Sequence, residues 1–452
     1  MKIIIAGDGK VGASLTKQLS SEGYDITLID TNGSVLEKTE EIFDVMVVQG
    51  NCASMDTLLQ AGVMEADLLI ATTNADELNL LCCMTAHGMN ADIHTIARIR
   101  NPEYTNQIYS MRDVFALSLV VNPEKQTAIE IERQLRYPGF LKCDTFAKGR
   151  VEIVELKIDE DSVLNNVKLS EISRIIKTKL LVCAVLRDGR AEVPGGEFIL
   201  KSGDKIFVTA SAEQIEILLD SMNISRRKIK NVIICGGGKV SVYLAQILHK
   251  KKINIKIIEN QYSRCLELAE LLPYSSIIHG DASDEVLLRK EGIENTDALI
   301  SMTGVDELNM IVSLYGKQCA NLKVITKLSH VDNNRILERL DIGNVINPKE
   351  LCSNTIVRYV RAMKKQSGAA VSVHTIAEGH MEALEFRLDE SAKHLNEPLK
   401  NVKLKKNTLI ASISKSGQHI LPDGDVALSQ GDTVVVVVTK DTAIHEFNDI
   451  FV

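Results

Sequence analysis

The chain has 452 residues, of which 45% are hydrophobic and 25% are charged, and these values are typical of a soluble protein with several domains. Its net charge of −8 argues against a nucleic-acid partner, and its aromatic content of 4%, without tryptophan, argues against base-stacking platforms. No apolar run approaches the roughly 20 residues that span a bilayer, and the apolar opening KIIIA predicts a first strand rather than a secretory signal. We therefore expect a cytoplasmic protein.

Cysteine and histidine usage predicts neither a disulfide framework nor a metal centre. The nine cysteines are an odd number and include no C-x-x-C pair, which is typical of reduced thiols in a cytosolic protein. The nearest histidine cluster, His374 and His380, lacks neighbouring co-ligands. We expect the cysteines to be mostly core residues and expect no metal site.

The first predicted elements are a strand from Lys2 to Ala6, a glycine-rich turn, and an amphipathic helix from Lys10 to Ser21. The turn has the spacing G-x-G-x-x-G between strand and helix, which predicts a dinucleotide site whose phosphates meet the helix N-terminus. Asp30 ends the strand DITLID, where an acid accepts a hydrogen bond from a ribose hydroxyl. Its charge favours NAD or adenosine nucleotides over NADP. The alternative is a glycine turn that binds nothing.

Later strands of the same domain supply further candidates, because ligands of such sheets lie outside the carboxyl ends of the strands. Thr73 and Asn74 follow the strand DLLIA, and Arg98 follows the strand HTIA. We expect Arg98 to contact phosphate, with a surface salt bridge as the alternative. The predicted cofactor-binding residues of the first half are Gly7, Asp8, Gly9, Lys10, Val11, Asp30, Thr73, Asn74 and Arg98.

An internal repeat at an offset near 230 residues is the most informative pattern. GDGKV at 7–11 recurs as GGGKV at 236–240, and DLLIATTNADELN, which ends at Asn79, recurs as DALISMTGVDELN, which ends at Asn309. The chain is therefore a duplicated unit with a second site. The predicted cofactor-binding residues of this site are Gly236, Gly237, Gly238, Lys239, Val240, Glu259 and Thr303.

The second site is less regular than the first. Ser241 replaces the third glycine of the turn, and Lys327 replaces Arg98. The third glycine serves packing more than phosphate contact, so a serine is tolerable. The alternative is a degenerate copy that is kept for its architecture. Lys10 and Lys239 are either point charges for phosphate or solvated lysines of a first helical turn.

Strands alternate with helices in the first part of each half, and a β-rich module follows, in which VEIVELKID from Val151 matches MEALEFRLD from Met381. The predicted fold class is therefore α/β, with two tandem Rossmann-like doubly wound parallel sheets, each followed by a small α+β domain. The predicted boundaries are 1–122 and 230–347 for the Rossmann domains, 123–140 and 348–368 for connector helices, and 141–225 and 369–452 for the small domains.

The sequence shows no arrangement of residues that is typical of catalysis. It has no Tyr-x-x-x-Lys pair, G-x-S-x-G elbow or P-loop, and the repeated acidic pairs at 76–77 and 306–307 fit the first turns of helices. We predict binding without turnover and no catalytic residues. The alternatives are an NAD-dependent oxidoreductase and a nucleic-acid-linked redox sensor. For the sensor, the chain offers only the basic stretches at 225–230 and 250–252.

These motifs resemble the TrkA family of Trk-type potassium uptake regulators, which carry two regulator-of-potassium-conductance (RCK, or KTN) units in tandem. The resemblance covers nearly the whole chain and rests on GDGKVG at 7–12, DITLIDTN at 25–32, VVQGN at 47–51, IARIR at 96–100 and GDASD at 280–284. It implies a cytoplasmic subunit, peripheral on the inner face of the cell membrane, that binds NAD(H), with ATP or ADP as further ligands. It also implies a membrane potassium-translocating partner and a homotetrameric ring, and it assigns nucleotide binding to both glycine turns.

Overall fold

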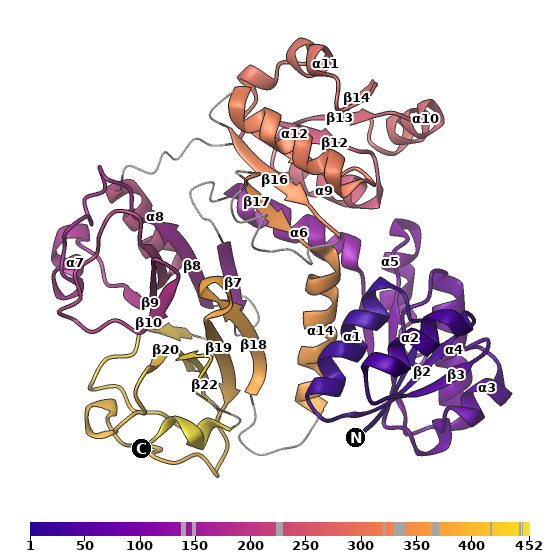
Figure 1. Ribbon diagram of the computed structural model, residues 1–452, viewed down its shortest axis with the longest axis horizontal. Coiled ribbons are helices and arrows are strands. Elements are labelled where there is room, and N and C mark those ends of the chain that lie inside the picture. Colours follow the sequence, from indigo (N-terminus) through magenta and orange to yellow (C-terminus); the bar gives the residue numbers. More distant parts are fainter. Residues whose placement is uncertain are drawn as a thin grey trace. The chain divides into compact units, whose positions relative to one another are not determined.

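The computed structural model describes residues 1–136, 142–146, 151–222, 229–319, 322–329, 340, 342–363, 370–415, 418–442, 444 and 446–452. The chain forms two compact units, and each unit takes one part from each half of the sequence (Figure 1). The first unit comprises Met1–Arg136 and Lys228–Val357, and the second comprises Tyr137–Arg227 and Arg358–Val452.

The first Rossmann domain has a six-stranded parallel sheet in the order β3-β2-β1-β4-β5-β6. The order reverses between β1 and β4, which is where a doubly wound sheet opens a crevice for ligands. The strands are β1 Lys2–Ala6, β2 Asp25–Asp30, β3 Met46–Gln49, β4 Leu68–Ala71, β5 His94–Arg98 and β6 Leu119–Val121. The helices are α1 Lys10–Ser21, α2 Gly33–Ile42, α3 Met55–Gln60, η1 Val63–Glu65, α4 Asp76–Met89 and α5 Pro102–Ser110.

The second Rossmann domain repeats this arrangement, with the sheet order β14-β13-β12-β15-β16-β17. The buried strands are continuous apolar runs, as expected for a sheet covered on both faces. The strands are β12 Asn231–Cys235, β13 Asn254–Glu259, β14 Ser276–His279, β15 Ala298–Ser301, β16 Lys323–Lys327 and β17 Asn344–Ile346. The described helices are α9 Lys239–Lys250, α10 Tyr262–Leu271, α11 Glu285–Lys290, η3 Ile293–Asn295 and α12 Asp306–Cys319.

Two long helices follow the Rossmann sheets, at both predicted connectors: α6 Pro123–Arg136 and α14 Pro348–Met363. α6 of the first half packs on α9 of the second half, and its Ala128, Ile131 and Leu135 are fully covered in that core. α14 reaches the first half, where the Ser353 hydroxyl donates to Ser14 Oγ at 3.1 Å. Residues 137–140 and 364–368 of the predicted connectors, and 225–228 at the junction of the halves, lie outside the described residues.

The small domains each contain a five-stranded sheet with antiparallel pairing, in the orders β10-β9-β11-β8-β7 and β18-β19-β22-β20-β21. The first also has two α-helices, whereas the helical turns of the second, where the structure describes it, are 3-10 turns. The first contains β7 Lys142–Phe146, β8 Val151–Lys157, α7 Leu169–Ile176, β9 Leu181–Arg187, β10 Arg190–Glu192, β11 Lys205–Thr209 and α8 Ala212–Ser221. The second contains β18 Ala370–Ile376, η4 Ala377–Gly379, β19 Met381–Arg387, η5 Leu399–Asn401, β20 Thr408–Lys415, β21 Gln418–Ile420, β22 Thr433–Thr439 and η6 Phe447–Ile450.

The two small domains share one apolar core inside the second unit. Phe146, Cys183 and Phe207 of the first domain pack in the same cluster as Met381 and Val435 of the second. These side chains are at most 2% exposed, so neither sheet face is covered by its own domain alone. The predicted fold class is confirmed in both halves.

The described cysteines are core residues, as predicted. Seven of them are buried and Cys319 is partly buried, while the side chain of Cys143 lies outside the described residues. Within the described ranges, no helix is both long and apolar enough to cross a membrane.

Candidate functional site

The glycine turn of the first half brings β1 against the end of β4. Gly7 has φ +99°, and a Cβ placed there would lie 3.0 Å from the backbone nitrogen of Thr73. A Cβ on Gly12 would lie 1.9 Å from the carbonyl oxygen of Gly7. Both positions therefore need glycine for reasons of backbone conformation and packing.

Neither backbone conformation nor packing within the protein requires a glycine at the middle position of each turn. A Cβ on Gly9 or on Gly238 would meet no atom within 4 Å, and neither residue has a positive φ. An open approach to the backbone at this position is what a bound pyrophosphate requires. The turn therefore has free space where the dinucleotide motif places phosphate.

The helices that follow the turns have uncapped N-termini. Gly9 and Gly238 are the N-cap residues of α1 and α9, and neither helix has a side-chain cap or an acidic residue in its first turn. Backbone N–H groups at such an end lack intrahelical acceptors and carry the positive end of the helix dipole. The predicted Lys10 and Lys239 begin these helices and are exposed. Both ends suit an anion.

The two carboxylates predicted to accept from a ribose hydroxyl, at the ends of β2 and β13, form hydrogen bonds with the backbone of the glycine turns. Asp30 accepts hydrogen bonds from the backbone N–H groups of Asp8, at 2.7 Å, and Asn32, at 2.9 Å. Glu259 accepts in the same way from Gly237, at 2.7 Å, and Gln261, at 2.8 Å. The two carboxylates thus occupy equivalent places beside the two turns.

The second turn position differs between the halves. Asp8 is buried, and its Oδ2 accepts from the Thr39 hydroxyl at 2.5 Å, while Oδ1 has no hydrogen-bond partner. Burial raises the pKa of the Asp8 carboxyl, and the charge of Asp30 raises it further. The hydrogen bond from Thr39 lowers this pKa, but the net shift is upward. In the second half a Cβ on Gly237 would lie 2.4 Å from Leu268 Cδ1, so a larger residue there would require the buried Leu268 side chain to shift.

Ser241 fits the place of the third glycine because its hydroxyl has an acceptor. The side chain is fully buried and donates to the carbonyl oxygen of Gly236. The serine is therefore accommodated by a hydrogen bond to the turn itself, and α9 begins at Lys239 as α1 begins at Lys10.

Two buried asparagines that sequence reasoning did not assign hold the loops after β4 and β15. Asn79 Oδ1 accepts from the backbone N–H and hydroxyl of Thr73, at 2.8 and 2.7 Å, and its Nδ2 donates to the carbonyl of Arg98 at 2.8 Å. Asn309 makes the equivalent bonds to Thr303 and to the carbonyl of Lys327. The repeated DELN segment was the signal that could have identified them.

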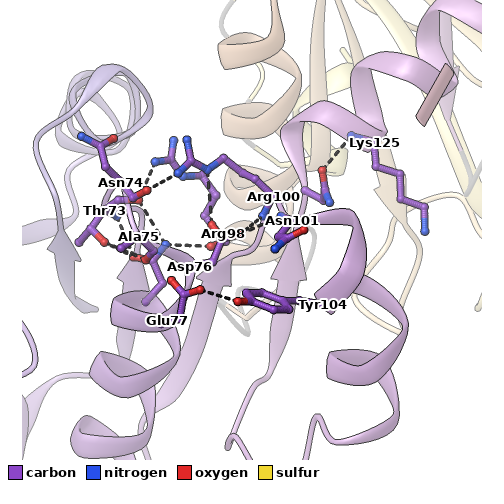
Figure 2. A network of polar contacts seen from close by, with 12 residues as sticks. Thr73, Asn74, Ala75, Asp76, Glu77, Arg98, Arg100, Asn101, Tyr104 and Lys125 are labelled. Carbon is purple, nitrogen blue, oxygen red and sulfur yellow. Dashed lines mark hydrogen bonds and ion pairs between the residues drawn. The ribbon is translucent and has the colours of Figure 1, made fainter. Parts of the chain in front are cut away.

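The predicted Arg98 lies inside the domain, at the end of β5, rather than in a surface salt bridge. Its Nη2 donates to the carbonyl of Thr73 at 2.6 Å, and its buried Nε has no partner (Figure 2). Burial lowers the pKa of the Arg98 guanidinium, and neighbouring Arg100 lowers it further. Lys327 has the same place in the second half, donates to the carbonyl of Met302 at 3.2 Å, and has its pKa lowered by burial.

Arg100 is a second arginine of this site that sequence reasoning missed. Its Nη2 donates to the carbonyl of Asn74, and its Nε lies 3.4 Å from Asp76 Oδ1 (Figure 2). Asp76 Oδ2 accepts from the backbone N–H groups of Arg100 and Asn101, each at 2.8 Å. Asp76 therefore begins α4, as predicted, and also fixes the loop after β5.

The two sites meet within the first unit, around Glu124 at the start of α6. Burial raises the pKa of the Glu124 carboxyl, against the opposing charges of Arg100, Arg98 and Lys239. Its Oε2 is buried without a hydrogen-bond partner. Lys239 of the second turn, together with Arg98 and Lys327 at the ends of β5 and β16, therefore acts on this one partly buried acid.

The structure thus gathers the predicted residues of each half at one end of its parallel sheet. The assignment of these residues to a nucleotide remains a prediction. In the part of the chain that is described, no group of three or more histidine, cysteine, aspartate or glutamate side chains is arranged to hold a metal ion.

Comparison with known families identifies both domain types in both halves. Residues 3–123 and 232–348 match the TrkA-N domain, and residues 153–223 and 383–452 match the TrkA-C domain. The chain is similar to Trk system potassium uptake protein TrkA homolog 1 of Methanosarcina mazei, with 31% identity over 96% of this chain and 97% of that protein. It is also 29% identical to the TrkA protein of Haemophilus influenzae, over 100% of this chain and 98% of that protein.

Solved structures share the fold at low sequence identity. A GsuK channel bound to NAD matches 97% of this chain and 77% of its own, with a TM-score of 0.62 and 17% identity. A GsuK RCK domain matches 97% of this chain and 92% of its own, with a TM-score of 0.61 and 17% identity.

Proposed function

Because the chain belongs to the TrkA family of Trk system potassium uptake proteins, we propose that it is a nucleotide-sensing regulatory subunit of such a system. The observation that carries the proposal is the pair of open turns. In each half, the middle glycine has free space and the following helix is uncapped. A carboxylate and a cation (the buried Arg98 or the partly buried Lys327) flank each turn, and this combination suits the ribose and the phosphates of a nucleotide.

The proposed ligand is NAD(H), with ATP and ADP as further ligands. The carboxylates of Asp30 and Glu259 lie beside the turns and are the groups proposed to accept from a ribose hydroxyl, and their charge disfavours a 2′-phosphate. The GsuK channel, which has the same fold, occurs bound to NAD and, in another structure, bound to ADP. Arg98 and Lys327 are the groups proposed to face phosphate, since each is a cation at the end of a strand beside a turn and burial lowers the pKa of both.

The proposed partner is a membrane potassium-translocating subunit, with this chain peripheral on the cytoplasmic face as a homotetrameric ring. Support for the partner comes from the relatives, which are named as potassium uptake proteins. Binding without turnover fits the groups beside the turns, since the threonines and cations there are engaged with backbone carbonyls and asparagine amides.

The proposed mechanism is that nucleotide binding shifts an equilibrium between two arrangements in which the two Rossmann domains pack against each other. A ligand shifts such an equilibrium only by its difference in affinity for the two arrangements. The first site lies close to the second within one unit, and the charges of Lys10 and Lys327 act on each other. A coupling free energy on the order of 1–3 kcal/mol between the sites is typical of such systems.

Calorimetric titration with NADH, NAD, ATP and ADP tests the proposal. Gly9→Val and Gly238→Val each add a side chain in the space for phosphate, at positions where a Cβ meets no protein atom within 4 Å, so we expect each to abolish binding at one site and leave folding intact. Asp30→Ala and Glu259→Ala weaken the same two sites separately. Gly195→Val, which is also at an open glycine but in the small domain, is the matched control and keeps both sites.

Two outcomes contradict the proposal. One is a wild-type protein that binds none of the four nucleotides. The other is a Gly9→Val, Gly238→Val double variant that binds them as the wild type does. Hydride transfer from NADH to any added substrate would support the oxidoreductase alternative instead.

A further inference from the structure

Two aromatic rings lie together beside the proposed second site and have no counterpart in the first. Tyr262 is the first residue of α10, and His279 is the last residue of β14. Their ring centroids are 5.5 Å apart at an angle of 73°, and the tyrosine is 63% exposed. A tyrosine ring that is so exposed contributes little to the core, so its place here is not explained by packing.

Both rings are next to the carboxylate proposed to hold the ribose. His279 is the register partner of Glu259 on the neighbouring strand, and the backbone N–H of Gln261 donates to Glu259 Oε1 at 2.8 Å immediately before Tyr262. The strands β13 and β14 and the helix α10 meet at this edge (Figure 1). Ligands of such sheets lie outside the carboxyl ends of the strands, and both rings lie at these ends.

Arg264 fixes the start of α10 against the glycine turn. Its Nε donates to the carbonyl of Gly237 at 2.9 Å, and its Nη1 forms an ion pair with Glu267 at 2.6 Å. The helix turn that carries Tyr262 is therefore tied to the turn that is proposed to bind phosphate. His279 is held as well, since its Nε2 lies 3.1 Å from the carbonyl oxygen of Asn260.

The first half shows that the fold does not require this pair. Gly33 begins α2 where Tyr262 begins α10, and Gln49 is the register partner of Asp30 where His279 is that of Glu259. The Gln49 amide donates to the carbonyl of Thr31 at 3.2 Å. At these equivalent backbone positions, the first half thus has a glycine and an amide side chain, and the second half has two aromatic rings.

We propose that Tyr262 and His279 form a stacking platform for the adenine base at the second site, so that the two sites recognise the base by different chemistry. The proposal rests on the proposed function, in which the second turn binds an adenine nucleotide. An exposed ring offers its face to a base, and a second ring at 73° contacts the edge of that base. The low aromatic content of the chain predicted no such platform, and this pair is a local exception.

The test measures the affinity of the second site alone for ADP, by titration of the Gly9→Val protein. The exchange of Tyr262→Gly together with His279→Gln gives the second site the residues of the first. We expect this double variant to bind ADP roughly tenfold more weakly, the effect of one lost base stack. Affinity for inorganic pyrophosphate, which has no base, should stay unchanged. Since the chain has no tryptophan, quenching of tyrosine emission by ADP is a second readout, lost with Tyr262→Gly.

The reverse exchange, Gly33→Tyr with Gln49→His in the Gly238→Val protein, should strengthen ADP binding at the first site. Unchanged ADP affinity in the Tyr262→Gly, His279→Gln variant would overturn the platform. So would an equal loss of ADP and pyrophosphate affinity, because it would indicate damage to the turn. A Gly9→Val protein that binds no nucleotide at all would overturn the function proposed for the second site, and the platform with it.

Discussion

Asp8 and Gly237 occupy equivalent positions in the two turns, but the side chains that pack against them differ. The buried Asp8 carboxylate accepts from the Thr39 hydroxyl, and in the second half the Leu268 side chain occupies the space where a Cβ of residue 237 would lie. Each position is therefore paired with one residue of the following helix, α2 or α10. Interior side chains are packed closely enough that such pairs must change together.

Exchanging the first pair for the second tests this dependence. Asp8→Gly alone leaves the buried Thr39 hydroxyl without its acceptor, and Thr39→Leu alone places an apolar group against a carboxylate. We expect the double variant to be more stable than the sum of the single changes predicts, by about 0.5–3 kcal/mol. Scanning calorimetry of all four proteins measures this coupling, and strictly additive changes would contradict it.

Lys323, at the start of β16, gives the protein a predictable pH dependence. Burial lowers the pKa of its ammonium group from 10.5 to about 7, and its Nζ donates to Asn344 Oδ1 at 3.1 Å. Below pH 7 the group is charged in both states, so the folded protein bears the full cost of the buried charge. Between about 7 and 10.5 the unfolded chain binds more protons than the folded one, so stability rises with pH.

Lys323→Gln removes the charge and keeps a donor for Asn344. We expect the variant to be more stable than the wild type below pH 7 and to lose that advantage progressively as the pH rises toward 10.5. Thermal unfolding of both proteins across this range measures the difference, because groups common to both cancel. A difference that does not vary with pH would show that Lys323 keeps its ordinary pKa.

The helix α9 connects the two sites at the scale of one element. It begins at the second glycine turn, and its Tyr243 hydroxyl accepts from Asn122 Nδ2 at 2.9 Å and donates to the carbonyl of Arg100 at 3.3 Å. Its end is tied to α6 by the ion pair of Lys251 with Glu132. A change at the second turn therefore acts directly on the loop that carries Arg100 in the first site.

Tyr243→Phe removes only the hydroxyl of this connection. We expect a loss of about 1–2 kcal/mol in stability, because two buried polar groups lose a partner. We also expect the effect of Gly238→Val on ADP affinity at the first site to shrink, because the coupling between sites is weakened. Tyr262→Phe, at an exposed tyrosine, is the control for stability. An unchanged influence of Gly238→Val would contradict the role of α9.

At the scale of the whole molecule, each compact unit is completed by both halves of the chain. The first unit covers Ile131 and Leu135 of α6 with the second Rossmann domain, and the second unit covers Phe146 and Phe207 with the second small domain. A half chain would expose both apolar faces. Exposed faces of this kind are rare in stable monomers.

The first half alone, residues 1–222, should therefore not be a stable monomer. Since the halves have the same fold, a second copy of the first half can cover the faces that the second half covers in the intact chain. We expect a dimer of half chains, measured by light scattering, with the full-length protein as the control. A monodisperse, folded monomer of residues 1–222 would contradict this expectation.

The sequence by itself determined the local structural motifs and their duplication. The strand Lys2–Ala6, the glycine spacing after it, and the acids Asp30 and Glu259 could be identified because backbone conformation and strand burial depend on residues close in the chain. The repeat then predicted the second Rossmann sheet, in spite of Ser241. These features predicted the fold class and the place of each candidate site.

Only the tertiary structure decided which groups are desolvated and what they contact. Asn79 could be seen as repeated, but its partners Thr73 and Arg98 come from the loop after β4 and from the end of β5. The burial of Arg98 and the convergence of the two sites on Glu124 likewise depend on atoms from distant segments. Desolvation and hydrogen-bond partners are set by what surrounds a group in space, and a linear pattern does not contain that information.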